Sequence, residues 1–154
     1  MARARSLSYK PFLPVGPMRL PDFHMPYEVG TSPHLDRARE ASVAWAREMR
    51  LIDAPPGVPG AGIWDERKLR GFDFALCSAG IDPDATPEEL ELSAQWLTWG
   101  TYADDYFPLV YNTTRDVAGA RACHERLTRM MPVDGPRTAA PSTPLEIGLA
   151  DLWT

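Results

Sequence analysis

The sequence predicts an all-α protein, and two observations support this fold class. Apolar residues recur at steps of three and four through most of the chain after residue 32, which is the period of an amphipathic helix. Capping residues mark helix starts, and the clearest is Thr86, followed by Pro87 and by Glu89 three residues on. No segment alternates apolar and polar residues convincingly, so a β-sheet has no support.

Two helices are predicted before Thr86. The first starts at Ser32 and Pro33, and its apolar face consists of Leu35, Ala38, Ser42, Trp45 and Met49. The second starts near Asp65 and ends at Gly80, a residue type favoured at helix C-termini. Its apolar face consists of Leu69, Phe72, Leu76 and Ala79.

Three helices follow. The one that opens at Thr86 is expected to run to Phe107 and to be ended by Pro108. Its later part, residues 94–103, is apolar nearly all round, which is typical of a helix in the middle of a bundle. The next begins near Thr114, with a stripe of Val117, Ala120, His124, Leu127 and Met131. The last opens with a capping box of Thr143 and Glu146.

Composition limits the partners. The chain has 154 residues, enough for one domain. Its net charge of -5 is spread without a basic stripe, which argues against nucleic acid or an anionic membrane surface. Neither a signal peptide nor an apolar run of about 20 residues is visible, so we expect a cytoplasmic protein with no membrane span. Cys77 and Cys123 lack metal-site spacing and are expected to be reduced, buried thiols.

Proline placement predicts the domain boundary. Six prolines interrupt the first 33 residues, where no continuous helix could run. We therefore interpret residues 1–31 as a proline-rich linker or wrapping arm, and residues 32–154 as the helical domain.

The candidate chemistry lies at Asp104 and Asp105, at the end of the predicted central helix. Adjacent buried carboxylates repel each other and are costly to desolvate, so they indicate a compensating cation. Mg²⁺ is the natural choice, because it binds carboxylate oxygens together with water and substrate phosphates. On spacing alone, an exposed pair facing solvent is an equal alternative.

The surrounding residues carry a family resemblance. Residues 96–108 read WLTWGTYADDYFP, which is similar to the aspartate-motif helix of bacterial class I terpene cyclases. The ending DDYFP resembles the C-terminal domain of geosmin synthases most closely. Residues 24–28, 31–36 and 45–49 resemble the first part of that domain, and residues 63–66 and 72–75 resemble its second helix. The likeness extends over nearly the whole chain from about residue 20.

The resemblance implies a helical bundle around an apolar pocket, in which Mg²⁺ binds a prenyl diphosphate and helps to ionise it. Asp104 is the expected principal ligand and catalytic residue, with Asp105 as its partner. Pro108 stands where the fuller motif has another carboxylate, so metal affinity should be weaker. In geosmin synthases the C-terminal domain acts later, on the terpene alcohol germacradienol, and that step needs acid-base chemistry.

Aromatic residues would form the rest of such a site, because ring faces stabilise carbocations in a dry cavity. The candidate substrate-pocket residues are Phe72, Trp96, Trp99 and Tyr102. For each of them, core packing is the competing interpretation. His124, on an apolar stripe, is interpreted as a core or helix-surface histidine rather than a ligand.

The family's second metal motif, Asn-x-x-x-Ser-x-x-x-Glu, is absent: Asn112 is the only asparagine, and Asp116 follows it by four. We therefore expect the N-terminal part of a terpene cyclase domain, truncated and inactive alone. The alternative is a catalytically dead helical remnant that acts as an interaction module. In both cases an uncovered bundle face predicts self-association or poor solubility.

Overall fold

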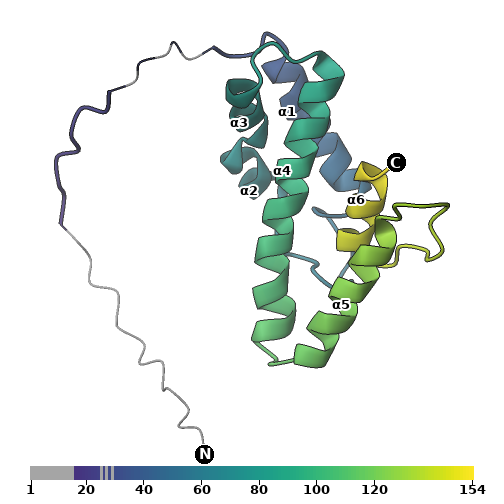
Figure 1. Ribbon diagram of the computed structural model, residues 1–154. Coiled ribbons are helices and arrows are strands. Elements are labelled where there is room, and N and C mark those ends of the chain that lie inside the picture. Colours follow the sequence, from purple (N-terminus) through teal and green to yellow (C-terminus); the bar gives the residue numbers. More distant parts are fainter. Residues whose placement is uncertain (1–15, 25, 27, 29) are drawn as a thin grey trace, which may run out of the picture.

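The computed structural model describes residues 16–24, 26, 28 and 30–154. Within these ranges the chain forms helices and no strands, which confirms the all-α prediction. The helices are α1 (Leu35–Glu48), α2 (Glu66–Phe72), α3 (Phe74–Ile81), α4 (Pro87–Phe107), the π-helical turn η1 (Pro108–Asn112), α5 (Val117–Met130) and α6 (Pro144–Leu152). The described part of the proline-rich arm runs away from the helices (Figure 1). The rest of that predicted arm, and Met25 and Tyr27 of the resembling segment, lie outside the described residues.

The central position of α4 is confirmed. It is the longest of the described helices and packs against α1, α3 and α6; in Figure 1 α3 lies to its left, α6 to its right, and α1 passes behind it. Its buried stripe follows steps of four, as one face of a helix does: Leu90, Ala94, Thr98, Tyr102 and Tyr106. The start of α4 is the predicted capping box, because Thr86 accepts from the Glu89 amide and the Glu89 carboxylate accepts from the Thr86 amide.

Two buried clusters hold the fold together. Where α1, α3 and α4 meet, the buried side chains are small, namely Ala38, Ala75, Ala79, Leu90 and Ala94, so the helices approach closely. The larger cluster joins α1, α4, α5 and α6 to the loop between α1 and α2 and includes Trp45, Trp64, Tyr102 and Leu149. A single bridge between Ile52 and Trp64 closes that loop and sets the Trp64 ring against α4.

The prediction of one helix from Asp65 to Gly80 is wrong. The chain breaks at Asp73, whose φ of 51° and ψ of 52° are left-handed, a conformation that Asp tolerates better than most residues. Arg39 donates to both carboxylate oxygens of Asp73, at 3.0 and 2.6 Å, and holds the break in place. Phe72, at the end of α2, and Leu76, in α3, are exposed rather than buried on one continuous face, and α3 continues past Gly80 to Ile81.

The predicted end of α4 at Phe107 is confirmed, and the chain continues from Pro108 through the π-helical turn η1.

Three further predictions need correction. The buried face of α5 is Cys123, Leu127 and Met130, so His124 lies outside it. Cys123 is buried as expected, whereas Cys77 is exposed. In α6, Thr143 caps the Glu146 amide, but the Glu146 carboxylate bonds to Ser142 and Arg126 rather than completing a capping box.

Candidate active site

A groove lies along the side of α4 that faces α5. It is lined by residues of α4, η1, α5 and α6: Trp99, Ala103, Asp104, Phe107, Pro108, Asn112, His124, Leu127, Thr128, Met131 and Leu149. Most of these side chains are apolar, and only Asp104 and His124 among them are titratable. The groove therefore combines an apolar wall with one carboxylate, which is the arrangement expected of a cation-dependent pocket for an apolar substrate.

Asp104 lies at the groove and is exposed. Its carboxylate makes no hydrogen bond or ion pair with any residue in the described part of the chain. The expectation that both aspartates are buried is therefore wrong, because the last turn of α4 reaches the open groove. The same geometry leaves the Asp104 oxygens accessible to a metal ion.

Asp105 has a different environment. Its Oδ2 accepts hydrogen bonds from the indole N–H of Trp64 at 2.8 Å and from Nζ of Lys68 at 3.0 Å. These two donors, Trp64 first, hold the pKa of Asp105 below its usual value. The carboxylate is half-buried and faces the start of α2. Neither Trp64 nor Lys68 was singled out as a site residue from sequence, although Trp64 lies in a segment that carries the resemblance.

The four aromatic candidates do not form one wall. Trp99 lines the groove, and its indole N–H donates to the Leu145 carbonyl at 2.9 Å. Trp96 packs edge-on against Trp99, with ring centroids 6.0 Å apart. Phe72 and Tyr102 instead contact Trp64, at 5.1 and 5.3 Å between centroids. The structure thus brings Trp99 to Asp104, and Phe72 and Tyr102 to the side of Asp105.

Groove residues that the sequence did not single out come from the turn after α4 and from α5. His124 is exposed, and its ring stacks on Phe107 with centroids 4.6 Å apart. Leu127 and Met131 belonged to the predicted stripe of α5 but were not connected with a site. No sequence signal connected them with Asp104, because their proximity depends on how the chain turns through η1 between α4 and α5.

Burial raises the pKa values of three phenols and one thiol near this end of the bundle. Desolvation is the main cause at Tyr102, Tyr106, Tyr111 and Cys123. These groups stay neutral at physiological pH and add no charge to the groove. The open carboxylate of Asp104 is therefore the principal negative group there.

The metal-binding capacity of this part of the chain is limited. Among the described residues, no three His, Cys, Asp or Glu side chains converge as a metal cluster. Mg²⁺ does not require one, because it commonly takes one or two protein carboxylates and fills its other positions with water and phosphate oxygens. The donor set at Asp104 therefore fits Mg²⁺ bound together with a phosphorylated substrate.

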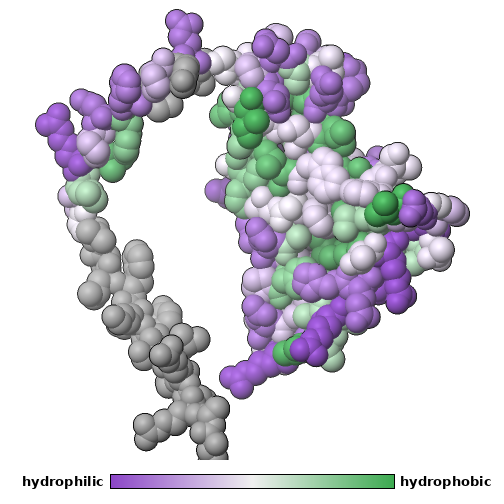
Figure 2. Space-filling model, in the orientation of Figure 1, coloured by the Kyte–Doolittle hydropathy of each residue, from purple (hydrophilic) through white to green (hydrophobic). Residues whose placement is uncertain are grey.

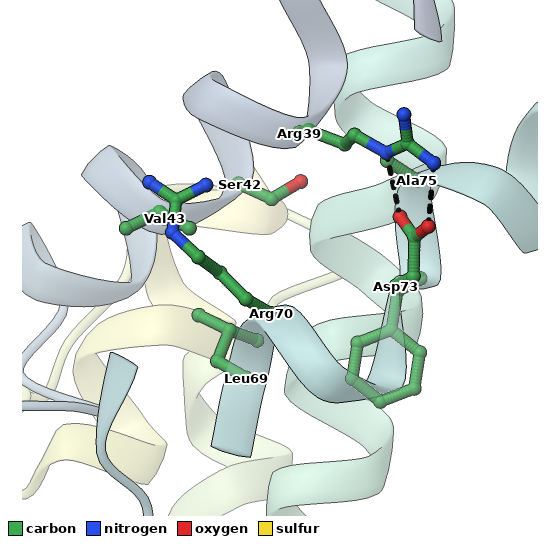
Figure 3. Close-up of a pocket in the computed structure, with 8 residues that line it drawn as sticks. Arg39, Ser42, Val43, Leu69, Arg70, Asp73 and Ala75 are labelled. Atoms are coloured by element: carbon green, nitrogen blue, oxygen red, sulfur yellow. Dashed lines mark hydrogen bonds and ion pairs between the residues drawn. The ribbon is translucent and has the colours of Figure 1, made fainter. Parts of the chain in front are cut away.

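A second pocket lies between α1, α2 and α3 and is lined by Arg39, Ser42, Val43, Leu69, Arg70, Asp73, Phe74 and Ala75 (Figure 3). Its two guanidinium groups are already neutralised. Arg39 pairs with Asp73, and Arg70 pairs with Glu40 at 2.9 Å. We interpret this pocket as part of the connection between α1 and the α2–α3 break.

Known proteins match both the region of the aspartate motif and most of the chain. Residues 95–154 match the model of terpene synthase family 2, C-terminal metal binding. A pentalenene synthase from Streptomyces avermitilis is 32% identical over 139 residues, which is 86% of this chain and 35% of that protein. A (+)-T-muurolol synthase from Roseiflexus castenholzii, named as cyclizing (2E,6E)-farnesyl diphosphate, is 29% identical over 127 residues, 82% of this chain and 35% of its own.

These matches support a bacterial class I terpene cyclase, as the motif predicted. The chain spans about a third of the length of the curated relatives it matches. No helix in the described ranges is long and apolar enough to cross a membrane. The closer likeness to geosmin synthases stays a prediction.

Proposed function

We propose that this chain carries the metal-binding aspartate motif of a sesquiterpenoid cyclase, in which Mg²⁺ at Asp104 supports carbon–oxygen lyase chemistry on a prenyl diphosphate. The observation that carries the proposal is the open Asp104 carboxylate at the mouth of an apolar groove. The substrates that fit a geosmin-like enzyme are farnesyl diphosphate and a germacradienol-type alcohol.

Bound Mg²⁺ would neutralise the departing diphosphate. The chain's own residues would supply the rest of the environment. Leu127, Leu149 and Met131 would form an apolar wall for the substrate, and the rings of Trp99 and Phe107 line the same groove. Aromatic faces stabilise positive charge in a dry site, which is what an allylic cation requires.

The first test is headspace mass spectrometry of the chain with Mg²⁺, offered farnesyl diphosphate and germacradienol in parallel. A volatile product that disappears in Asp104→Ala supports the proposal. A parallel thermal melt should show Mg²⁺ with inorganic pyrophosphate stabilising the wild type but not Asp104→Ala, because a ligand that binds only the folded state raises its stability. Equal responses of the two proteins in both assays would refute the proposal.

The alternative, a helical remnant that binds another protein, also has an observation in its favour. Large apolar side chains are exposed on several helices, including Phe72, Leu76, Ile81 and Leu92. In Figure 2 apolar patches show over α3 and α4, whereas the outer side of α5 is hydrophilic. No product, no Mg²⁺ response and concentration-dependent self-association, measured together, would favour this alternative.

A further inference from the structure

The two adjacent aspartates face different surroundings. Residues one step apart on an α-helix project about 100° apart, since the helix has 3.6 residues per turn. Asp104 lies at the groove between α4 and α5. Asp105 is held towards α2 by Trp64 and Lys68. Because both residues belong to the last turn of α4, a rotation of that turn would move both carboxylates together.

Of the two donors to Asp105, Trp64 is fixed by packing, whereas the Lys68 side chain is 44% exposed and is held by its contacts. Trp64 is 2% exposed, and its ring packs against Phe72, Phe74 and Tyr102. Lys68 lies in the first turn of α2, where its backbone N–H donates to the Asp65 cap at 2.7 Å. Its Nζ also lies 6.0 Å from the Trp64 ring centroid and 5.8 Å from that of Phe72, within reach of a cation–π attraction.

Both donors meet the same oxygen, Oδ2 of Asp105. If this oxygen turned towards the groove, the hydrogen bond from the buried Trp64 indole would be lost, and the Lys68 ammonium would lose the position it holds here. Each charge-assisted bond is stronger than a neutral one, so the arrangement resists rotation of the last turn of α4. We call Trp64 and Lys68 together the Asp105 clamp.

We propose that Trp64 and Lys68 are positioning residues of the metal motif: by holding Asp105 on the α2 side of α4, they aim the Asp104 carboxylate into the groove. This inference rests on the proposed function, because it assigns the metal to Asp104. It also removes Asp105 from the expected ligand pair and gives it the role of an anchor.

Lys68→Met tests the proposal because the two interpretations of Lys68 predict different changes in Mg²⁺ affinity. Lys68 is a cation close to a cation site, so if it has no positioning role, its removal should leave Mg²⁺ binding unchanged or tighten it. If Lys68 positions Asp105, its removal should instead weaken Mg²⁺ binding. Substitutions that loosen the support of a metal ligand commonly weaken affinity about tenfold or more. We therefore expect about tenfold weaker binding in Lys68→Met.

The measurement is an NMR titration with MgCl2 that follows the Asp104 backbone amide and the Trp64 indole N–H in the same spectra. Lys68→Arg retains a donor for Asp105 and should restore the affinity. Arg67→Met is the matched control. It removes the same charge from the same helix, and Arg67 is exposed with no side-chain hydrogen bond to any described residue.

The outcomes separate the two proposals. If Asp104→Ala loses the Mg²⁺ response, and Lys68→Met weakens it with a shifted Trp64 indole signal while Arg67→Met does not, the clamp is supported. Unchanged or tighter binding in Lys68→Met, with the response still lost in Asp104→Ala, overturns the clamp alone. A wild type that does not respond, or an Asp104→Ala that responds equally, overturns the proposed function and the clamp with it.

Discussion

The two sides of α4 differ in how they are covered: one is packed against an aromatic cluster, and the other borders an open groove. On the side of the α1–α2 loop, Trp64, Phe72, Phe74 and Tyr102 form a continuous aromatic cluster, and the polar groups there have partners. On the side of α5 and α6 the wall is an open groove, where the Asp104 carboxylate has no partner among the described residues.

This difference separates scaffold from candidate site within a single helix. Asp105 and Tyr102 belong to the closed side, where each makes directed hydrogen bonds. Trp99 and Asp104 belong to the open side, where surface remains for a ligand. Proteins place function where interactions are left incomplete, so the open side is the better candidate for binding.

The largest expected effect compares the two sides directly. Trp64→Ala should destabilise the chain by about 4 kcal/mol, because it leaves a cavity among three packed rings. Trp99→Ala, at a half-buried position on the groove, should cost about 2 kcal/mol. Urea unfolding followed by circular dichroism measures both. Equal losses would mean that the groove wall is as structural as the aromatic cluster, and the comparison would fail.

The second effect concerns the ion pair between Arg126 of α5 and Glu146 of α6, which joins the two helices on the open side. Glu146 at the start of α6 is 2% exposed, and Arg126 of α5 donates to its two oxygens at 2.5 and 2.7 Å. Burial alone would raise the pKa of Glu146, but the bonds from Arg126 and Ser142 outweigh it and lower the pKa to about 2. Glu146 is buried but the Arg126 side chain is 39% exposed, so Glu146→Gln should cost about 2 kcal/mol through the loss of charge-assisted hydrogen bonds.

The lowered pKa gives this pair a pH signature. A carboxyl with a depressed pKa contributes its full stability above the unfolded value of 4.5 and loses it as the pH falls towards 2. Hydrogen exchange should therefore show α6 opening before α1 in that window. Glu40→Gln, which removes the exposed partner of Arg70, is the control and should leave stability nearly unchanged. Simultaneous opening of α1 and α6 would contradict the separation of the two sides.

Much of the fold could be predicted because helix starts and apolar periodicity are local properties. The capping box at Thr86 and the central position of α4 follow from neighbouring residues alone. The break at Asp73 could not be predicted, because it depends on Arg39, a residue 34 positions earlier in the chain. Periodicity continues through the break and gives no sign of it.

The site shows the same limit. The aspartate motif and its helix were predictable from residues 96–108. The different surroundings of Asp104 and Asp105 were not, since they depend on Trp64 and Lys68, which approach from a different loop and helix. The face of α5 was assigned wrongly because the π-helical turn after Pro108 changes the angle at which that helix enters the bundle.

The smallest effect tests whether Tyr102 is scaffold or pocket. Its hydroxyl donates to the Gly60 carbonyl at 3.2 Å. Gly60 has a φ of +87°, and a Cβ there would overlap the Tyr102 hydroxyl and the Tyr106 ring, so backbone and phenol are in direct contact.

Tyr102→Phe removes one hydrogen bond and should cost about 1 kcal/mol, with no change in the Mg²⁺ response. The measurement is a pair of thermal melts, with and without Mg²⁺ and inorganic pyrophosphate, and Thr128→Ala on the groove is the comparison variant. If Tyr102→Phe abolishes the rise in melting temperature that Mg²⁺ and pyrophosphate cause, the closed side contributes to binding. Phe72 and Tyr102 would then regain the pocket role that the sequence suggested, and the division between the two sides of α4 would have to be abandoned.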